Sequence, residues 1–488
     1  MSGILDAVPF SFSYVLVVIM VILVISLIMV IRGGAKAKAL INNYGSGTAN
    51  QLLWYIGPQF MMILILFFVD YDRLQTSFKE DPIVSFFYWN SINQDNTLFS
   101  EHYLNKHYTK PAAALAQDKK NIILIVVDAL RADHMSLYDY QRKTTPFMDS
   151  LCSLGKLHKI NIALAGSNNT ISSLLNMLFS ESITSLDQER LGVHEVLRHF
   201  DYKINFILSG VHRDWYGLDH YYGSNIDLFF EGPDSQHFDP NNDLLILEHL
   251  DKTPLFKEAG KSFFFFHLMS VHSVGTVNDR FRVFKPDKAP LFIGEEIDKK
   301  LVYTNNYDNG ICQADYIIKE IFRKLSDLGY LSNTLAIITS DHGESLGGNG
   351  IFGHGNFLNQ DELRIPMLIY DPDSISYENT RFATHIDIAP TILSKINVPP
   401  PGLWEGLPMN EPQSYPRFLF HHGFGGTYSL TYSDTENLIY YKRDWEHKLP
   451  VEKIYLMDRS FDQLHTKIDD SLTEIIRAKY DEKNRIYP

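Results

Sequence analysis

The sequence predicts an α/β protein: an α/β/α sandwich built on a mostly parallel central sheet and preceded by two transmembrane helices. Two observations carry this prediction. Between residues 121 and 400, short apolar runs rich in β-branched residues alternate with helical patterns, as in a parallel sheet covered by helices. Before residue 70, two long runs contain no charged residue, which is the pattern of membrane-spanning segments.

The composition narrows the class of function. The chain has 488 residues and a formal net charge of -14 at pH 7. A nucleic-acid partner would require a basic face, so this charge argues against one. The two cysteines, Cys152 and Cys312, form no CxxC pattern. This excludes a cysteine metal site and leaves open whether the two pair in a disulfide.

Residues 1–75 are expected to form a membrane anchor. The run 14–31 is long enough to cross a bilayer, whereas the run 51–69 is near the minimum, so a re-entrant segment is the alternative there. The loop between the runs carries only basic charges, and both outer flanks carry acids. The positive-inside rule therefore predicts a multi-pass inner-membrane protein whose remaining chain is periplasmic or extracellular.

The rest of the chain divides into three parts. Residues 76–120 are expected to be a linker, whose aromatic stretch 82–89 fits either an interfacial helix on the bilayer or packing against the soluble domain. Residues 121–400 carry the predicted chemistry. Residues 401–488 contain strand-like runs at 417–420, 438–442 and 453–457 and a closing helix.

Five strands and four helices are predicted within 121–400. The strands are expected at 122–127, 204–208, 263–267, 335–339 and 367–370. The helices are expected at 145–154, 170–179, 311–325 and 388–396. The first strand is an unbroken apolar run, which is typical of a strand buried on both faces of a sheet.

Two of these strands end on possible metal ligands. Asp128 follows the first strand, and Asp341 with His342 follows the strand 335–339. Ligands of open α/β sheets bind beyond the carboxyl ends of the strands, so these side chains could hold one divalent cation. His and Asp together suit zinc or manganese better than calcium. The alternative for Asp128 is that it caps the next helix.

Thr170 is the candidate for a fourth ligand. It stands where the small polar turn of ALAGSNNTISSLLNMLFS, residues 163–180, enters an apolar-periodic helix. A hydroxyl at that place lies at the positive end of the helix dipole, which favours an anionic phosphoryl group. The alternative, that Thr170 only caps the helix, is disfavoured by the neighbouring candidate ligands.

The remaining histidines are interpreted by position. In FFFFHLMSVHSVG, residues 263–275, His267 ends an apolar strand and is expected to be structural. His272 follows in a loop and is expected to contact a bound phosphate. Farther upstream, His212, Arg213 and Trp215 fit either an acceptor pocket or, as we favour, a surface loop packed by its own aromatic residues.

Taken together, these segments resemble the alkaline phosphatase/sulfatase superfamily, and within it the membrane-anchored phosphoethanolamine and lipoteichoic-acid-type transferases. DALRADHMSLYDYQRKTTPFMDSL is similar to the first metal motif of that superfamily, and ITSDHGESLGGNGIFGHG to the second. MSVHS is similar to the loop with the phosphate-contacting histidine, and HIDIAPTIL to the segment after the last core strand. The resemblance covers roughly residues 121–400.

The resemblance implies a sulfatase-like fold with a small C-terminal antiparallel subdomain, and it implies roles for six residues. The implied metal ligands are Asp128, Thr170, Asp341 and His342. Thr170 is also the implied nucleophile, and His272 and His354 are the implied contacts of the transferred group.

Three departures limit the resemblance. Sulfatases carry a C/S-x-P-x-R signature where this chain has NNTISSLL, so sulfate-ester hydrolysis is disfavoured. Asp128 stands where the phosphoethanolamine transferases usually have Glu. The two cysteines and the two expected spans are fewer than the several disulfides and about five spans of the lipid A-modifying enzymes. The chain is therefore expected to belong to a related branch.

The predicted reaction is a ping-pong phosphoryl transfer. One divalent ion, zinc before manganese, would lower the pKa of the Thr170 hydroxyl. Thr170 would take a phosphoethanolamine-type headgroup from a phosphatidylethanolamine-like donor, and a glycan or lipid acceptor would receive it with His354 or His272 as base. The alternatives are a periplasmic phosphatase or phosphodiesterase, and a non-enzymatic sensor, which is disfavoured because no implied ligand is missing.

Overall fold

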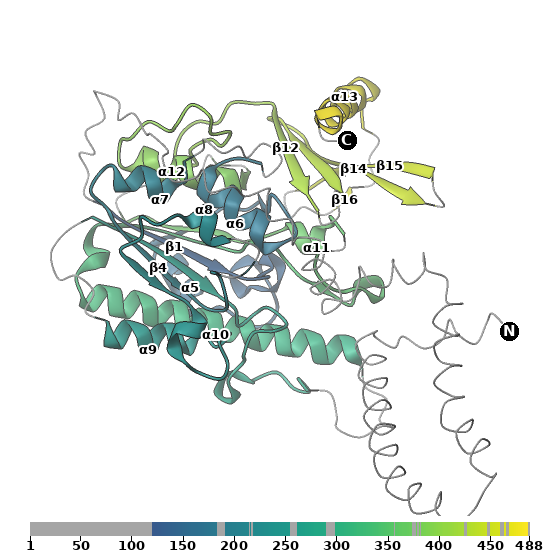
Figure 1. Cartoon of the computed structure of the whole chain (residues 1–488). Coiled ribbons are helices and arrows are strands. Elements are labelled where there is room, and N and C mark those ends of the chain that lie inside the picture. The colour runs from purple at the N-terminus through teal and green to yellow at the C-terminus, as the bar shows by residue number, and fades with distance from the viewer. Residues whose placement is uncertain are drawn as a thin grey trace, which may run out of the picture. The chain divides into compact units, whose positions relative to one another are not determined.

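Figure 1 shows the computed structural model of the chain. The described residues are 120–486 except 183–190, 214, 216–217, 254–260, 289–297, 356, 373–376, 378–379, 381, 424–426, 447–448, 459–462 and 465–467. They belong to one compact unit, residues 101–488. The predicted transmembrane segments and interfacial helix lie outside the described residues. Within the described part, no helix combines the length and apolar character needed to span a bilayer.

Seven strands form the central sheet in the order β2-β10-β7-β1-β6-β4-β5. They are β1 (Asn121–Val127), β2 (Leu157–Lys159), β4 (Lys203–Leu208), β5 (Leu228–Phe230), β6 (Ser262–Leu268), β7 (Thr334–Thr339) and β10 (Met367–Tyr370). All neighbours pair in parallel except at β10, which pairs antiparallel with both β7 and β2. The sheet is therefore mixed, and the predicted parallel arrangement holds at its centre.

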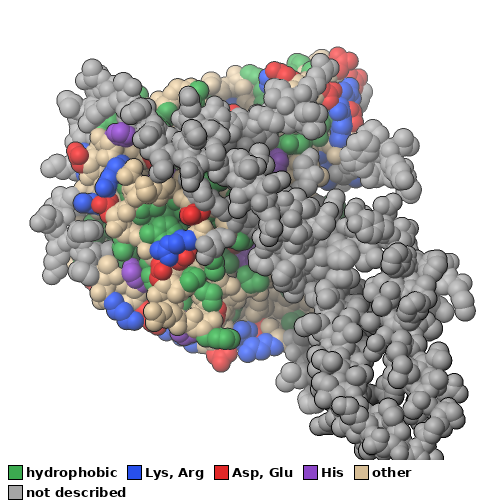
Figure 2. All heavy atoms as spheres, in the orientation of Figure 1, with side chains coloured by type: hydrophobic (Ala, Val, Ile, Leu, Met, Phe, Trp, Pro, Cys, Tyr) green, Lys and Arg blue, Asp and Glu red, His purple; other side chains and the backbone are tan. Residues whose placement is uncertain are grey.

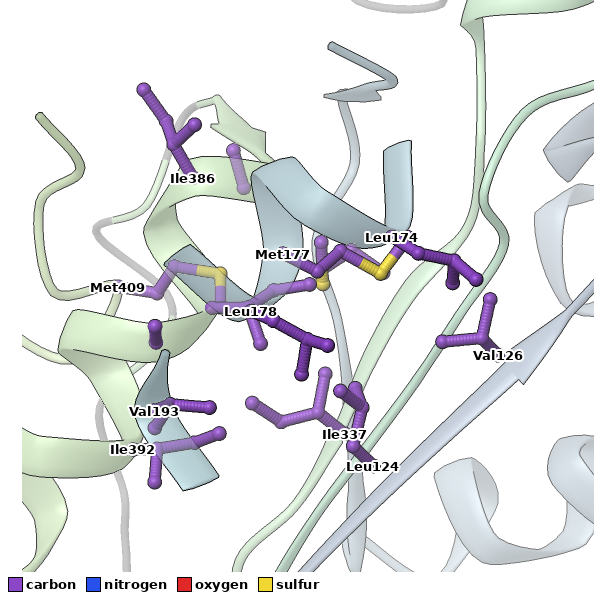
Figure 3. Close-up of a cluster of buried hydrophobic side chains, with 14 of the residues drawn as sticks. Leu124, Val126, Leu174, Met177, Leu178, Val193, Ile337, Ile386, Ile392 and Met409 are labelled. Atoms are coloured by element: carbon purple, nitrogen blue, oxygen red, sulfur yellow. The ribbon is translucent and has the colours of Figure 1, made fainter. Parts of the chain in front are cut away.

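Strand β1 is buried on both faces, as its unbroken apolar run predicts. Ile122, Leu124 and Val126 lie in one core with the helices α6 (Thr170–Phe179), α7 (Val193–Arg198) and α12 (Ile388–Lys395). The alternate residues of β1 lie in a second core with α5 (Pro146–Ser153), α9 (Leu244–Lys252) and α10 (Lys299–Asp327). Figure 1 shows these two groups of helices on opposite faces of the sheet, and Figure 3 shows side chains of α6 above β1.

The five predicted strands are confirmed to within one residue at each end, and three of the four helices match as closely. The fourth, α10, begins at Lys299 rather than at residue 311. Its first turns carry polar residues, so they show no apolar period. Polar side chains of this part of α10 form hydrogen bonds with other segments of the chain. Asp308 accepts hydrogen bonds from Tyr140 and Arg142, and Asn309 accepts one from Phe284 N.

The strands β2 and β5 and the helices α7 and α9 were not predicted, and neither were the short elements that complete the domain. They are β3 (Ala163–Leu164) paired with β11 (Ala383–Thr384), β8 (Ser345–Leu346) paired with β9 (Phe352–Gly353), α8 (Leu218–Tyr222) and α11 (Gln360–Leu363). Runs this short carry too little periodicity to be recognised from sequence.

The C-terminal part forms a separate antiparallel sheet, as the family resemblance implied. Its strands are β12 (Arg417–His422), β13 (Tyr428–Ser433), β14 (Leu438–Glu446), β15 (Leu449–Met457) and β16 (Gln463–Leu464). The closing helix α13 (Asp470–Ile486) buries Ile476 and Tyr480 in the core of this sheet. A bridge between Ser167 and His422 joins the sheet to the loop that precedes α6.

The face of the molecule in Figure 2 carries both signs of charge. Acidic and basic side chains of the described residues lie interspersed there. Long-range attraction of a polyanion needs a field of one sign, and the described residues of this face present none.

Gly310 allows α10 to lie against the segment that carries His272. A Cβ at this position would overlap the carbonyl oxygen of Ser270 and lie 3.0 Å from Val271 Cα. We expect Gly310→Ala to lower the free energy of unfolding by about 2 kcal/mol, because the overlap is with backbone and exceeds the helix preference of alanine. Thermal denaturation checks this. Gly402→Ala is the matched control, since a Cβ there meets nothing within 4 Å, and equal stability of the two variants would contradict the prediction.

Candidate active site

Three neighbouring strands end level with one another at the carboxyl edge of the sheet. Val126 of β1 pairs with His267 of β6 on one side and with Thr339 of β7 on the other. Asp128 lies two residues after Val126, and Asp341 lies two residues after Thr339. As a result, one ligand atom from each of Asp128, His267 and Asp341 lies within 4.8 Å of the others.

A tight turn after β1 sets the orientation of Asp341. Ala129 has a left-handed φ of 63°, which is uncommon for alanine. Its N–H donates to Asp341 Oδ1 at 3.0 Å, and its carbonyl accepts from the Tyr307 hydroxyl at 2.6 Å. The backbone N–H of His342 also donates to Asp341 Oδ1. One carboxylate oxygen of Asp341 is thereby used, and Oδ2 is left without a hydrogen-bond partner among the described residues, 3.4 Å from His342 Nε2.

The unsatisfied atoms of this group fit a metal ion. Asp128 Oδ1, Asp341 Oδ2 and His267 Nε2 are buried, and none has a hydrogen-bond partner among the described residues. Burial, and then the carboxylate of Asp341, raise the pKa of Asp128 well above its usual value. Buried charge of this kind is costly unless it is paired. A divalent cation would supply the missing partner, and oxygen with imidazole nitrogen is a donor set for zinc or manganese.

Thr170 is not the cap of α6. The N-cap is Asn169, whose side chain accepts from Ser172 N at 3.0 Å. Thr170 begins the helix, and its hydroxyl lies 3.2 Å from His342 Nε2. The same ring nitrogen lies 3.4 Å from Asp341 Oδ2 and 3.7 Å from Asp128 Oδ1. The structure thus brings the four predicted ligands together, and their binding of a metal stays a prediction.

His354 and His272 lie beside this group. The ring centroid of His354 is 4.0 Å from that of His342 and 5.0 Å from that of His272. His354 Nδ1 contacts Glu344 Oε2 at 2.6 Å. Burial lowers the pKa of His354, but Glu344, with smaller contributions from Asp341 and Glu362, outweighs this effect, and the net pKa is raised. Burial, and then His354, lower the pKa of His272 to about 4. One of the two rings is therefore poised to carry a proton.

His267 was expected to be structural, and the structure adds it to the candidate ligands. Its Nε2 lies 3.9 Å from Asp128 Oδ2. A strand-end histidine beside an acidic strand end was the available signal, but it becomes useful only when β6 is known to neighbour β1. His212 is buried and contacts His267 Nδ1 at 3.2 Å, so it lies behind the site rather than in an acceptor pocket.

Glu362 is a buried carboxyl that joins the two halves of the site, and no sequence pattern marks it. Glu362 accepts a hydrogen bond from Asn168 Nδ2 at 2.8 Å and another from Gly355 N at 3.0 Å. Asn168 lies two residues before Thr170 in the sequence, and Gly355 directly follows His354. Ser345 donates to the other oxygen of Glu362. Burial raises the pKa of Glu362 from its ordinary 4.5 to about 7.

We expect the raised pKa of Glu362 to make the protein less stable as the pH rises. The folded state holds this proton more tightly than the unfolded state. The contribution of the proton to the free energy of unfolding is therefore complete below pH 4.5, and it is lost as the pH rises from there to about 7. The loss is about 3 kcal/mol. In Glu362→Gln, the melting temperature should depend less on pH over this range than in the parent. Glu248→Gln, at an exposed carboxylate, is the control, and parallel pH curves for Glu362→Gln and the parent would refute the assignment.

Comparisons with known proteins agree on the fold. A family model described as Sulfatase matches residues 120–398. Phosphoethanolamine transferase EptA of Helicobacter pylori is 23% identical over 288 residues, which are 56% of this chain and 51% of the relative. This chain thus spans about half the length of that curated relative.

Two solved structures illustrate the likeness. The C-terminal periplasmic domain of EptC from Escherichia coli, in complex with Zn, superposes with a TM-score of 0.53 at 16% identity, covering 62% of this chain and 90% of that one. The integral membrane lipooligosaccharide phosphoethanolamine transferase A of Neisseria meningitidis gives 0.50 at 18% identity, covering 73% and 71%. At these identities the likeness concerns the fold alone.

Proposed function

Because the chain belongs to the sulfatase family, we propose that it is a metal-dependent phosphoethanolamine-type transferase of the cell envelope. The donor would be a membrane phospholipid, and the acceptor a glycan or lipid. The observation that carries this proposal is the Thr170 hydroxyl, which is free of helix capping and lies 3.2 Å from His342 Nε2. The same ring nitrogen lies near Asp128 Oδ1 and Asp341 Oδ2, which have no hydrogen-bond partner among the described residues. The transferase names of relatives such as the Helicobacter pylori protein support the choice of headgroup.

Asp128, Asp341, His342 and Thr170 would hold the metal, with His267 as a further ligand. We propose zinc, which the related EptC domain binds, with manganese as the ion to test against it. When bound, the ion balances the buried carboxylates, lowers the pKa of the Thr170 hydroxyl and screens the phosphate charge.

In the first half-reaction, Thr170 Oγ1 releases its proton to water and attacks the phosphorus of the donor phosphodiester. The bond from phosphorus to the diacylglycerol oxygen breaks. His354 donates a proton to that leaving oxygen, which fits the raised pKa that Glu344 confers. Phosphoethanolamine remains covalently bound to Thr170.

In the second half-reaction, an acceptor hydroxyl attacks the same phosphorus. His354, now neutral, takes the proton of that hydroxyl. The bond between phosphorus and Thr170 Oγ1 breaks, and Thr170 recovers a proton from water. His272, whose ring faces His354, would contact the phosphoryl oxygens in both halves.

The proposed membrane anchor explains the choice of donor. Residues 1–75 would hold the catalytic domain at the outer face of the inner membrane, with residues 76–120 as linker and residues 121–488 in the periplasm. A phospholipid then reaches Thr170 from the bilayer surface. A reporter fused after Arg73 tests this topology, and cytoplasmic activity of the reporter would refute it.

Peptide mass spectrometry of the detergent-purified protein, incubated with mixed phospholipids, tests the reaction. We expect diacylglycerol release and a phosphoethanolamine mass on the peptide that contains Thr170. Free phosphoethanolamine released steadily without any acceptor would favour the phosphodiesterase alternative. Release of diacylglycerol with the adduct on another peptide would show that the nucleophile is not Thr170.

A further inference from the structure

Three buried side chains form a series of hydrogen bonds that begins at the candidate ligand His267. His267 Nδ1 lies 3.2 Å from His212 Nε2, and His212 Nδ1 lies 3.1 Å from the Tyr222 hydroxyl at the end of α8. All three side chains are about 1% exposed. The other ring nitrogen of His267, Nε2, is the atom that faces Asp128 and Asp341.

The backbone around His212 is fixed independently of its ring. Glu231 is buried, and its Oε2 accepts from the backbone N–H groups of His212 and Arg213 at 2.7 and 2.9 Å. The ring of His212 therefore has a defined position between Tyr222 and His267. The two imidazole planes stand at 89°, so a nitrogen of one ring meets the edge of the other.

We propose that His212 is a positioning residue of the metal centre, which with Tyr222 holds the ring of His267 and directs its Nε2 lone pair at the ion. A histidine that binds metal through Nε2 must carry its proton on Nδ1, and that N–H needs an acceptor. His212 Nε2 is the acceptor in reach. His212 then carries its own proton on Nδ1 and donates it to the Tyr222 oxygen.

The hydrogen bonds between Tyr222, His212 and His267 can also point in the opposite direction, so this series of hydrogen bonds has two states. With the Tyr222 hydroxyl donating to His212 and His212 donating to His267, the Nε2 of His267 carries a proton and faces the Asp128 carboxylate. Both directions hold the same number of protons. Metal binding would select the first direction, because only there is the Nε2 lone pair of His267 free for an ion.

Metal affinity of the full-length protein in detergent is the direct test. The probe is Zn²⁺ alone, titrated against a chromophoric chelator, with Co²⁺ absorption as the report of the ligand geometry. His212→Phe keeps a ring of similar size and removes the acceptor, so we expect the Kd for Zn²⁺ to rise about 10- to 100-fold and the Co²⁺ spectrum to shift. His212→Gln restores an acceptor and should recover most of the affinity. Tyr222→Phe removes only the far end of this series of hydrogen bonds and should weaken binding less.

This inference rests on the metal centre proposed above, and its readout does not depend on any transfer activity. A purely structural role would lower the melting temperature of the chelator-treated His212→Phe protein and leave its Kd and Co²⁺ spectrum unchanged, which would overturn the proposal. Unchanged affinity in His267→Ala would overturn it as well, because His267 would then not be a ligand. If His212→Phe does not fold, the His212→Gln and Tyr222→Phe variants decide, by the Kd for Zn²⁺ and by the Co²⁺ spectrum. Loss of headgroup transfer with intact metal binding would count against the proposed function alone.

Discussion

Thr170→Ala is expected to lower headgroup transfer by about 10⁴-fold or more, because it removes the atom that bonds to phosphorus. Metal binding should persist, since Asp128, Asp341 and the histidines remain. The covalent adduct should disappear from the peptide that contains residue 170. Transfer of a labelled headgroup from phospholipid vesicles, followed at several donor concentrations, measures the effect on kcat and KM separately.

Ser172→Ala is the matched control for this prediction. Ser172 lies on the same first turn of α6 and is also buried, but no described contact places its hydroxyl in the site. Thr170→Ser should retain a measurable part of the activity, because a hydroxyl remains. Turnover of Thr170→Ala within tenfold of the parent would exclude Thr170 as the nucleophile.

Asp128→Asn is expected to abolish the response to metal and yet to stabilise the metal-free protein. The parent buries Asp128 beside Asp341, and burial together with that carboxylate disfavours its ionised form. The neutral amide removes this repulsion. In the parent, metal at about 1,000 times its Kd adds about 4 kcal/mol to the free energy of unfolding, and a chelator removes that gain. Thermal denaturation with and without a chelator shows both effects, and transfer should fall on the order of 10³-fold.

The control for this experiment is Asp279→Asn, since the Asp279 side chain is 92% exposed. Its melting temperature should respond to chelator as the parent does. An Asp128→Asn protein whose melting temperature still falls on chelation would show that the ion is held elsewhere.

The strands and the candidate ligands could be predicted because their signals are local. The run 122–127 is apolar throughout and is followed directly by Asp128, and the run 335–339 is followed by Ser340 and Asp341. Such patterns need no knowledge of the partner strands. The reversed direction of β10 has no local signal, because an apolar run reads the same for either pairing.

The missed residues act through contacts between distant segments. His267 becomes a candidate ligand only because β6 lies next to β1. Glu362 accepts a hydrogen bond from Asn168, which lies 194 positions away in the sequence. In the sequence itself, nothing distinguishes Glu362 from any other glutamate near a short helix. His212 is positioned by Glu231 and Tyr222, so its own segment suggested only an acceptor pocket or a surface loop.

The level ends of β1, β6 and β7 have a consequence for the biogenesis of the protein. Asp128 is synthesised more than two hundred residues before Asp341. Their carboxylates meet only after β7 has joined β1 in the sheet. If the chain is exported and binds a metal as proposed, the nascent chain therefore has no complete site to load during export, and the ion would be held by folded protein. Under the proposed function, the ion would be a late addition whose occupancy reports that translocation and folding are complete.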